Sequence, residues 1–437
     1  MPEFVNKLKT NLLTLTFFLG NSYLSGCLSV TLKILMLNFL VLAQRIPFPA
    51  NKGEKIRTFN QVKHLSELGC AVTVFSPMNE TTDTAHSVGL QCELDNVSCS
   101  LFSLKHKVNR LIKGMLTGES LSVTNFYSAH LQQAFDEQLR QEGMDVVICT
   151  SSAMAKYIFC SKVFSKLGYK PKLVMDFMDV DSDKWLQYVQ SSSLPMSYIY
   201  SREHKLIADY ERRITEVFDE CYLISEKEVE LFNDQVCNAP NVKVLGNGLD
   251  TQSFYPPEKS HQNEDPVFIF TGVMDYKPNV DAVVWFVDNC WLSVLNEYPN
   301  AQFIIAGMKP SSEVEALTKY KGIDVTGFVD DILPYYHQAD YFVAPFRLAR
   351  GVQNKVLQAF ACKLPVLSTP MGAEGINCHD NESILIANTP DEFIVAINQL
   401  ENDAELKSSI KENAYKLIVE EYSWQAQLEP LKQFTQE

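Results

Sequence analysis

The amino-acid sequence predicts an α/β protein made of two parallel-sheet domains. The chain has 437 residues, more than one hydrophobic core usually fills, and 46% of them are apolar. Apolar runs of strand length alternate with amphipathic runs of helix length, which is the pattern of parallel sheets. A polar, proline-bearing stretch at residues 254–266 interrupts this alternation and marks a domain boundary.

We expect four segments in chain order. They are an extension at residues 1–30, an N-terminal domain at 31–252, a C-terminal domain at 253–415, and a C-terminal helix at 416–437 that returns to the N-terminal domain. The extension has a short apolar run followed by Leu24-Ser25-Gly26-Cys27, the form of a bacterial lipoprotein cleavage site. Because the run is too short to span a bilayer, we interpret the extension as disordered or as a misassigned start, with Met36 nearer the natural start. The alternative is an export signal.

The N-terminal domain is predicted to open with a buried strand at residues 32–43, where the apolar run is continuous. A loop at residues 44–57, rich in proline, glycine and basic residues, follows, and then a helix from Phe59. Further strands are expected at residues 71–75, 146–150, 173–177 and 220–225, and a long polar helix at 198–218. This order is typical of a parallel sheet with helical connections.

A basic amphipathic helix is predicted at residues 104–115. Its apolar face would contain Leu104, Val108, Leu111 and Met115, and its other face Lys105, Lys107, Arg110 and Lys113. Such a helix can rest on an anionic membrane surface. It can equally be a solvated helix that packs its apolar face on the sheet, and the sequence leaves both interpretations open.

The C-terminal domain repeats the alternation of strands and helices. Strands are expected at residues 267–271, 301–306, 323–326, 341–345 and 366–368, and helical segments at 280–295, 312–320 and 406–434. Two open parallel sheets joined end to end leave a cleft between the carboxyl ends of their strands. That cleft is the usual ligand site of such proteins.

The stretch from Asp340 to Ile376 predicts an anion-binding turn. A buried strand ends at Pro345, the pair Arg350-Gly351 makes a turn, and apolar residues at helical spacing follow from Val352. A strand, tight turn and helix start present unpaired N–H groups and a positive dipole end, which suit phosphate groups.

Composition and missing motifs exclude several classes of protein. A net charge of −15 argues against nonspecific nucleic-acid binding. The 11 cysteines show neither C-x-x-C pairs nor zinc-ligand spacing, so we interpret them as reduced thiols of a cytosolic protein without a structural metal. The sequence has no H-E-x-x-H, G-x-S-x-G or Walker A pattern, which argues against metal-dependent hydrolysis, serine esterase chemistry and P-loop ATPase activity.

Several motifs together resemble the family-four glycosyltransferases, which have the GT-B fold of two Rossmann-like domains. They are Pro49-Ala50-Asn51-Lys52-Gly53, Gly246-Asn247-Gly248-Leu249-Asp250, Ala306-Gly307, Gly327-Phe328-Val329-Asp330-Asp331, and residues 340–366. Longer blocks resemble the sugar transferases associated with PEP-CTERM/exosortase exopolysaccharide loci. These blocks are RIPFPANKGEKIR, MDFMDVDSDKW, FTGVMDYKPNVDAVVWF and LARGVQNKVLQAFA.

The resemblance implies that the C-terminal domain binds a nucleoside-diphosphate sugar. The base would lie against the turn of Gly327, Phe328 and Val329, and the diphosphate and sugar over Gly351 and Val352. The further donor residues would be Lys355, contacting a phosphate oxygen, and Gly53, a glycine of the N-terminal loop that lets the backbone approach the donor phosphate. For Lys355 the alternative is a solvated helix residue.

Two positions depart from the family pattern. The family has Glu, seven residues, then Glu, where this chain has Arg350 and Gln358. Gln358 can still accept a hydrogen bond from a ribose hydroxyl, whereas Arg350 cannot accept one and is expected to pair with a phosphate, an acidic sugar or an acidic acceptor, or else with a surface carboxylate. The family's Arg and Lys after the first strand of the second domain are replaced by Val273-Met274-Asp275.

The N-terminal domain is expected to bind the acceptor. The candidate acceptor-binding residues are the loop cations Arg45, Lys52, Lys55 and Arg57, which would hold an anionic group such as a lipid diphosphate or would be solvated. The acceptor-side His of the family is absent, and Asp179 and Asp181 are the candidate catalytic residues, with helix capping as their alternative role.

The resulting hypothesis is a metal-independent, retaining hexosyltransferase of exopolysaccharide or cell-surface glycan synthesis. Its partners would be a nucleotide sugar and a glycan or lipid-linked acceptor, with no other cofactor, no metal and no nucleic acid. We expect a cytoplasmic location, with peripheral contact at the inner face of the membrane as a further possibility. The alternatives are a nucleotide-sugar epimerase of the same fold and a GT-B protein that binds a nucleotide sugar without turnover.

Overall fold

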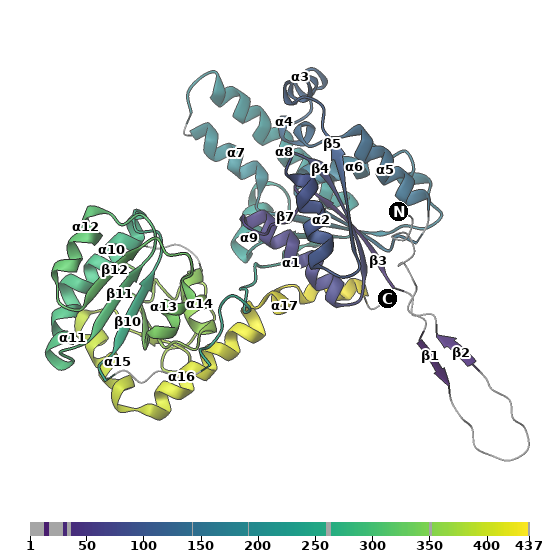
Figure 1. Ribbon diagram of the computed structural model, residues 1–437. Coiled ribbons are helices and arrows are strands. Elements are labelled where there is room, and N and C mark those ends of the chain that lie inside the picture. Colours follow the sequence, from purple (N-terminus) through teal and green to yellow (C-terminus); the bar gives the residue numbers. More distant parts are fainter. Residues whose placement is uncertain are drawn as a thin grey trace, which may run out of the picture. The chain divides into compact units, whose positions relative to one another are not determined.

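The structure, a computed structural model, describes residues 36–141, 143–190, 192–258, 264–348 and 352–435. It also describes the backbone of two short antiparallel strands, β1 (Leu13–Thr16) and β2 (Ser29–Leu32). The predicted cleavage site at Cys27 and the turn residues Arg350 and Gly351 lie outside the described residues. The chain divides into two units (Figure 1): the first is Met1–Gly246 with Pro430–Glu437, and the second is Asn247–Glu429.

The first unit contains a seven-stranded parallel sheet in the order β5-β4-β3-β6-β7-β8-β9. The strands are β3 (Asn38–Ala43), β4 (Ala71–Met78), β5 (Val97–Ser103), β6 (Val146–Thr150), β7 (Lys172–Met178), β8 (Glu220–Leu223) and β9 (Val242–Val244). Strands β3 and β6 are central and almost wholly buried, as their continuous apolar runs predicted. The two edge strands β5 and β9 were not predicted.

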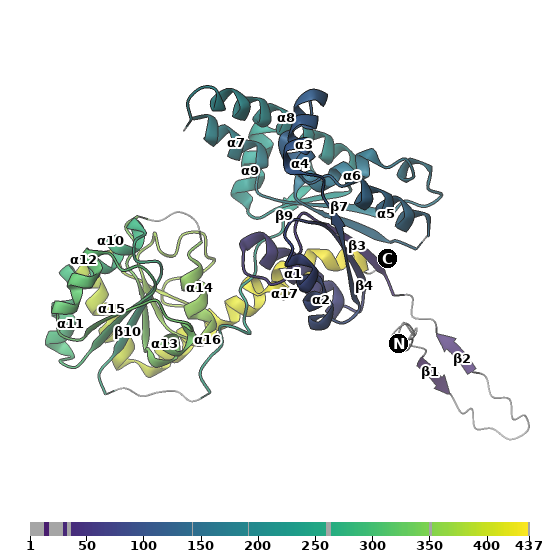
Figure 2. The ribbon, with the colours of Figure 1, turned by 45° about the horizontal axis from the view of Figure 1, so that its top comes forward.

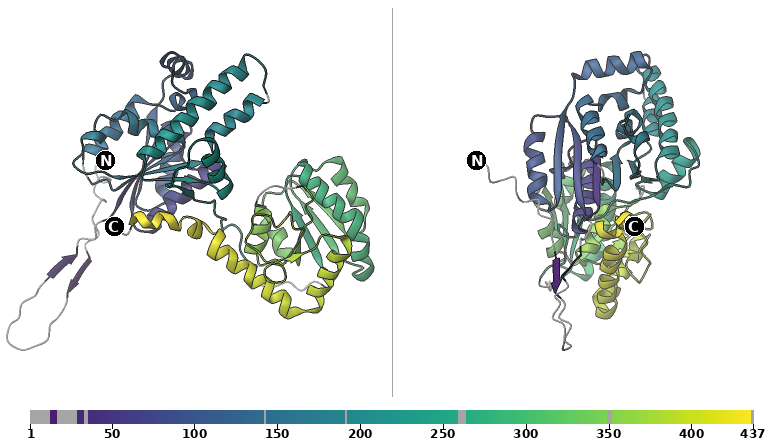
Figure 3. Two further views of the ribbon diagram at one scale, coloured as in Figure 1. Left: turned by 180° about the vertical axis from the view of Figure 1, so that it is seen from behind. Right: turned by 90° about the vertical axis from the view of Figure 1, so that its right-hand side faces the viewer.

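Nine α-helices are described in the first unit. They are α1 (Gly53–Glu67), α2 (Asp83–Glu93), α3 (Lys107–Thr117), α4 (Leu121–Asn125), α5 (Ala129–Arg140), α6 (Ala155–Cys160), α7 (Asp181–Gln190), α8 (Met196–Val217) and α9 (Glu226–Gln235). The predicted long helix at 198–218 is confirmed as α8, which pairs with α7 in a helical hairpin (Figure 3). The predicted loop at 44–57 is wrong in its last part, because α1 already begins at Gly53.

The second unit contains a six-stranded parallel sheet in the order β12-β11-β10-β13-β14-β15, with helices on either side (Figure 2). The strands are β10 (Val267–Thr271), β11 (Gln302–Ala306), β12 (Ile323–Gly327), β13 (Tyr341–Ala344), β14 (Val366–Ser368) and β15 (Leu385–Ile386). The helices are α10 (Lys277–Phe286), α11 (Leu292–Glu297), α12 (Ser312–Glu315), α13 (Leu333–Gln338), α14 (Asn354–Ala361), α15 (Pro390–Asn402), α16 (Ala404–Leu417) and α17 (Trp424–Gln427). Two parallel-sheet α/β domains are therefore present, as predicted.

The C-terminal segment is less regular than the single helix predicted for 406–434. A π-helical turn at Ile418–Tyr422 separates α16 from α17, and a 3-10 helix at Glu429–Thr435 follows. Within the first unit, the amide nitrogen of Gln433 donates to the hydroxyl of Tyr222 at 2.8 Å, and Leu431 is buried. In the part of the chain that the structure describes, no helix combines the length and the apolar character needed to cross a bilayer.

Candidate functional site

The candidate donor site lies at the carboxyl ends of the strands of the second unit. Helix α14 follows β13 and begins at Asn354, two residues later than predicted, with Gln353 in extended conformation before it. Among the described residues no side chain caps this helix, so N–H groups at its start, where an α-helix has no acceptor of its own, can meet a ligand. Val352 is exposed beside them. The start of this helix is therefore suited to an anion, and the predicted anion-binding turn stays a prediction.

Lys355 lies in the first turn of α14 and is half-buried. Its ammonium donates to the side-chain oxygen of Asn279 at 2.6 Å and lies 5.0 Å and 4.9 Å from the ring centres of Phe270 and Phe346. The ion pairs found among the described residues do not include Lys355. Burial lowers the pKa of Lys355 to about 8. A cation held by neutral groups retains its charge for an anionic ligand.

Asn279 was not singled out from the sequence, yet it holds Lys355 in place. It is buried, and its amide nitrogen donates to the carbonyl of Val273 at 2.9 Å. This bond fixes the side-chain oxygen toward Lys355. The sequence shows only that Asn279 lies near the start of a helix, after a turn that resembles the family motif. An Asn at a helix start often serves as a cap, so this position did not identify a contact with Lys355.

Two glycines bring the ends of β10 and β11 close together at the same place. A Cβ on Gly307, whose φ is +149°, would lie 1.7 Å from the carbonyl oxygen of Gly272. A Cβ on Gly272 would lie 3.2 Å from the ammonium of Lys355 and 2.6 Å from the Asn279 amide nitrogen. Side chains at these positions would push the backbone apart and displace Lys355.

Gln358 is held by a buried tyrosine. The Tyr336 hydroxyl donates to the side-chain oxygen of Gln358 at 3.1 Å and lies 2.7 Å from the hydroxyl of Thr271. Burial raises the pKa of Tyr336, which keeps the hydroxyl protonated. The oxygen that was predicted to meet a ribose hydroxyl therefore already accepts one hydrogen bond within the protein.

The predicted base-binding turn follows β12 at the same edge of the sheet. Gly327 has φ +68°, which is the left-handed conformation that glycine adopts freely. The turn places Phe328 in solvent with 67% of its surface exposed, and Val329 is half-buried. The structure thus puts residues 327–329, Lys355 and Gln358 on loops and helix starts at the carboxyl ends of one sheet.

The predicted acceptor loop has three residues near the surface. Arg45 pairs with Glu54, Lys52 is exposed and precedes α1, and Lys55 is half-buried in the first turn of α1. Gly53 is the first residue of α1, and a Cβ there would meet no atom within 4 Å. The backbone at Gly53 is therefore open to approach by a ligand.

Arg57 differs from its predicted role, because it is inside the protein. Only 1% of its side chain is exposed. It donates to both oxygens of Asp176 at 2.7 Å and 2.8 Å, and to the carbonyl of Gly246 at 3.1 Å. Gln61 also donates to Asp176 at 2.6 Å. Arg57 therefore joins α1 to β7 instead of facing an acceptor.

Asp179 and Asp181 lie where β7 leads into α7. Asp179 is 54% exposed, while Asp181 is 28% exposed and accepts a bond from the Ser152 hydroxyl at 2.5 Å. The Lys184 ammonium lies 4.0 Å and 3.7 Å from the two carboxylates. Burial raises the pKa of Asp181, which Ser152 and Lys184 partly oppose. Asp181 is also the first residue of α7, so its helix-terminus role remains alongside the catalytic hypothesis.

A second carboxylate near Asp181 was missed from the sequence. Glu211 is fully buried in α8 and accepts a bond from the backbone N–H of Ser182 at 3.3 Å. Burial raises its pKa to about 8. Nothing in the polar helix pattern distinguishes Glu211 from its exposed neighbours.

Over the described ranges, no cluster of three or more His, Cys, Asp or Glu side chains is arranged to hold a metal ion.

Comparison with known proteins supports the glycosyltransferase resemblance. Residues 265–403 match the family described as "Glycosyl transferases group 1". The chain is also 24% identical over 406 residues to an "Uncharacterized 44.6 kDa protein in cps region" from Klebsiella pneumoniae, a match that covers 89% of this chain and 97% of that protein.

Three solved structures illustrate the shared fold. A glycosyltransferase from Rickettsia africae matches with a TM-score of 0.56 at 14% identity, covering 92% of this chain and 99% of that one. HepE from Anabaena, solved in complex with UDP, matches with a TM-score of 0.55 at 11% identity and the same coverage. TarM from S. aureus, in complex with Fondaparinux, alpha-GlcNAc-glycerol and UDP, matches with a TM-score of 0.54 at 10% identity, covering 92% and 100%. The chain therefore has the GT-B fold, and its residues 265–403 match the group 1 glycosyl transferases.

Proposed function

We propose that this protein transfers a sugar from a nucleoside-diphosphate sugar to a lipid-linked or polysaccharide acceptor. The observation that carries the proposal is Lys355, an ammonium held by Asn279 and two aromatic rings at the uncapped start of α14. That helix belongs to the part of the chain that matches the group 1 glycosyl transferases. The structures of HepE with UDP and with UDP-glucose, and the cps region of the Klebsiella relative, support a nucleotide-sugar donor and a polysaccharide product.

In this proposal the donor diphosphate lies against Lys355 and the N–H groups at the start of α14. Negative charge grows on the departing nucleoside diphosphate as the bond to the sugar breaks, and the ammonium and the helix dipole stabilise that charge. The base lies against residues 327–329, where Phe328 is exposed. Val352 borders the sugar, and the donor roles expected for Arg350 and Gly351 from the resemblance are kept in the proposal. Gln358 borders the ribose, in the orientation that Tyr336 gives it.

The acceptor side is proposed from the first unit. Lys52 is exposed just before the start of α1, and Arg45 and Lys55 are near it in sequence. Asp179 and Asp181 remain the candidates for a polar role at the reacting centre. Retention of configuration, a hexose donor and independence from metal ions are parts of the proposal, as are the association with PEP-CTERM/exosortase loci and a cytoplasmic location in contact with the membrane.

One observation favours a second function, nucleotide-sugar binding without turnover. Arg350 and Gln358 replace both carboxylates of the family pattern, and the oxygen of Gln358 already accepts a bond from Tyr336. The donor site is then fit to hold a nucleotide, while its contact with the sugar lacks the usual acceptors.

One assay separates these functions. The purified full chain is incubated with a panel of nucleotide sugars, with and without a membrane lipid extract, and release of nucleoside diphosphate is measured. Release that depends on the extract supports transfer, and interconversion of the nucleotide sugars would instead identify an epimerase. Tight binding of a nucleotide sugar without release would contradict both enzymatic functions and support the binding protein.

A further inference from the structure

Helix α3 of the first unit presents an apolar face to solvent. Val108, Ile112, Met115 and Leu116 are spaced along one side of the helix and are all exposed, Leu116 to 83%. The sequence left open whether this segment packs its apolar face on the sheet. In the structure only Gly114 of α3 is buried, so the apolar side chains do not serve the core of the first unit.

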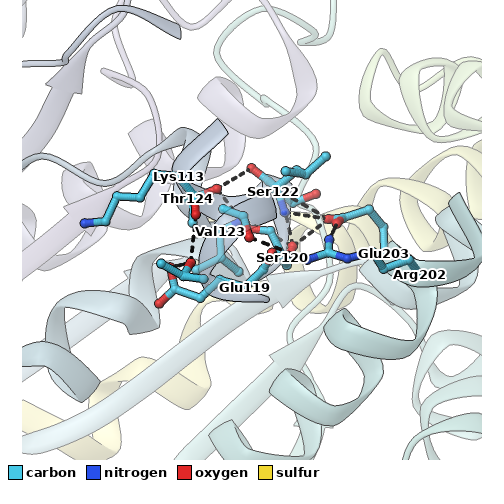
Figure 4. A network of polar contacts seen from close by, with 11 residues as sticks. Lys113, Glu119, Ser120, Ser122, Val123, Thr124, Arg202 and Glu203 are labelled. Atoms are coloured by element: carbon cyan, nitrogen blue, oxygen red, sulfur yellow. Dashed lines mark hydrogen bonds and ion pairs between the residues drawn. The ribbon is translucent and has the colours of Figure 1, made fainter. Parts of the chain in front are cut away.

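The inner side of α3 is fixed, which makes its outward face a defined surface. A Cβ on Gly114 would lie 2.5 Å from the Thr124 hydroxyl, so α3 and α4 are in close contact. Arg202 of α8 donates to the carbonyl of Gly114 at 3.5 Å and to that of Glu119 at 3.0 Å. Figure 4 shows Arg202 beside Glu203. Both Arg202 and the start of α4 in turn bind the carboxylate of Glu203, which is fully buried.

The apolar face is bordered by positive charge. Residues 104–118 contain Lys105, Lys107, Arg110 and Lys113 and no carboxylate, in a chain whose net charge is −15. None of the four cations belongs to an ion pair with another described residue. A helix with an apolar face and flanking cations has the chemistry of an interfacial helix on anionic lipid.

A cationic pocket of about 210 Å³ adjoins α3, at the carboxyl end of β5. Lys105, Arg110, Lys113 and Lys156 line it, and no carboxylate does so in the described part of the chain. The ammonium groups of Lys113 and Lys156 lie 5.7 Å and 5.1 Å from the ring centre of Tyr127. The terminal nitrogens of Arg110 donate to the carbonyl of Lys105 and to the side-chain oxygen of Asn125, while its buried Nε has no acceptor among the described residues. Lys156 is bound to Glu119 at 2.7 Å. Such a pocket is suited to a phosphate group.

We propose that α3 docks the protein on an anionic lipid bilayer, with Val108, Ile112 and Leu116 among the lipid headgroups and the phosphate of one lipid in the pocket beside Arg110 and Lys113. The membrane would present the lipid-linked acceptor to the protein, and this part of the inference rests on the proposed function. Its test needs neither donor nor turnover, so the two proposals fail separately.

The test is co-sedimentation of the full chain with lipid vesicles. One set contains phosphatidylcholine alone, and the other contains phosphatidylcholine and phosphatidylglycerol in equal parts. We expect binding to the anionic vesicles to be at least tenfold stronger than to the neutral ones. The double variant Ile112→Glu/Leu116→Glu should lose at least tenfold of that binding, and Lys105→Ala/Lys113→Ala should lose the preference for anionic lipid.

The matched control is Leu292→Glu, because Leu292 lies in α11 of the second unit and is 73% exposed. It should sediment with vesicles like the wild type, and thermal melts should show that all variants fold. Wild-type protein that stays in the supernatant with both vesicle types would overturn the proposal. Undiminished binding by the Ile112/Leu116 double variant would do the same, and an unchanged lipid preference in the Lys105/Lys113 variant would overturn the phosphate pocket.

Discussion

Replacement of Lys355 by alanine tests the donor site at its centre. The ammonium donates to Asn279 at 2.6 Å and has no ion-pair partner among the described residues, so its charge is available to the donor diphosphate. A hydrogen bond between charged groups contributes about 1.5–3 kcal/mol. Loss of that contact in the transition state lowers kcat/KM by roughly 10- to 150-fold. We therefore expect Lys355→Ala to reduce kcat/KM for the nucleotide sugar by at least about tenfold.

The assay is steady-state release of nucleoside diphosphate at varied donor concentration, with Lys416→Ala as control. Lys416 is an exposed lysine of α16 in the same unit, 68% exposed, and its loss should leave the kinetics unchanged. The pH profile gives a second readout. Because burial lowers the pKa of Lys355 to about 8, the free enzyme loses this positive charge as pH rises through that value, and wild-type kcat/KM should fall. Lys355→Ala should lack that step. Unchanged kcat/KM in a folded Lys355→Ala protein would show that Lys355 does not contact the donor diphosphate.

Three further predictions concern the supporting residues. Arg57→Met leaves the buried carboxylate of Asp176 without a positively charged partner. Urea denaturation should show that the free energy of unfolding falls by about 3–5 kcal/mol. A loss below about 1 kcal/mol would contradict the buried ion pair. Burial raises the pKa of Glu211 from 4.5 to about 8, so between these pH values the folded protein keeps a proton that the unfolded chain has released. The free energy of unfolding therefore falls by up to about 1.4 kcal/mol for each pH unit in that range. Thermal melts should therefore show Glu211→Gln gaining stability over the wild type as pH rises through that window, and a difference independent of pH would refute the assignment. Tyr336→Phe removes the hydroxyl that contacts Thr271 and Gln358. Chemical denaturation should show a free energy of unfolding lower by about 1–3 kcal/mol, and calorimetry should show weaker donor binding. Unchanged donor affinity would show that Gln358 does not contact the donor.

The sequence predicted the fold where burial is continuous. Strands β3, β6 and β10 are long apolar runs, and a buried parallel strand needs such a run on both faces. Strand β5 was missed because it is a half-exposed edge strand with alternating polar residues, and β15 because it has two residues. The helix predicted for 406–434 is interrupted at Ile418–Tyr422, where the helical pattern continues but the hydrogen bonding changes.

The candidate site was predictable only where spacing determines position. Lys355 follows a strand and a glycine turn, so its place at a helix start could be inferred from the sequence. Asn279 lies 76 positions away and became visible only through its contact with Lys355. Arg57 was assigned to the acceptor because a basic loop predicts charge but not burial, and its partner Asp176 is 119 positions distant. Long-range pairs of this kind are set by tertiary structure, which local patterns do not contain.

Sugar transfer itself can be measured with a label on the sugar. The full chain is incubated with nucleotide sugars labelled in the sugar and with the membrane lipid extract, and the label is counted in the lipid or polysaccharide fraction. We expect label from at least one donor to enter that fraction with wild-type protein, and Lys355→Ala to reduce the rate at least about tenfold. Label that stays on the nucleotide with every donor, although the protein binds one of them, would contradict the transferase.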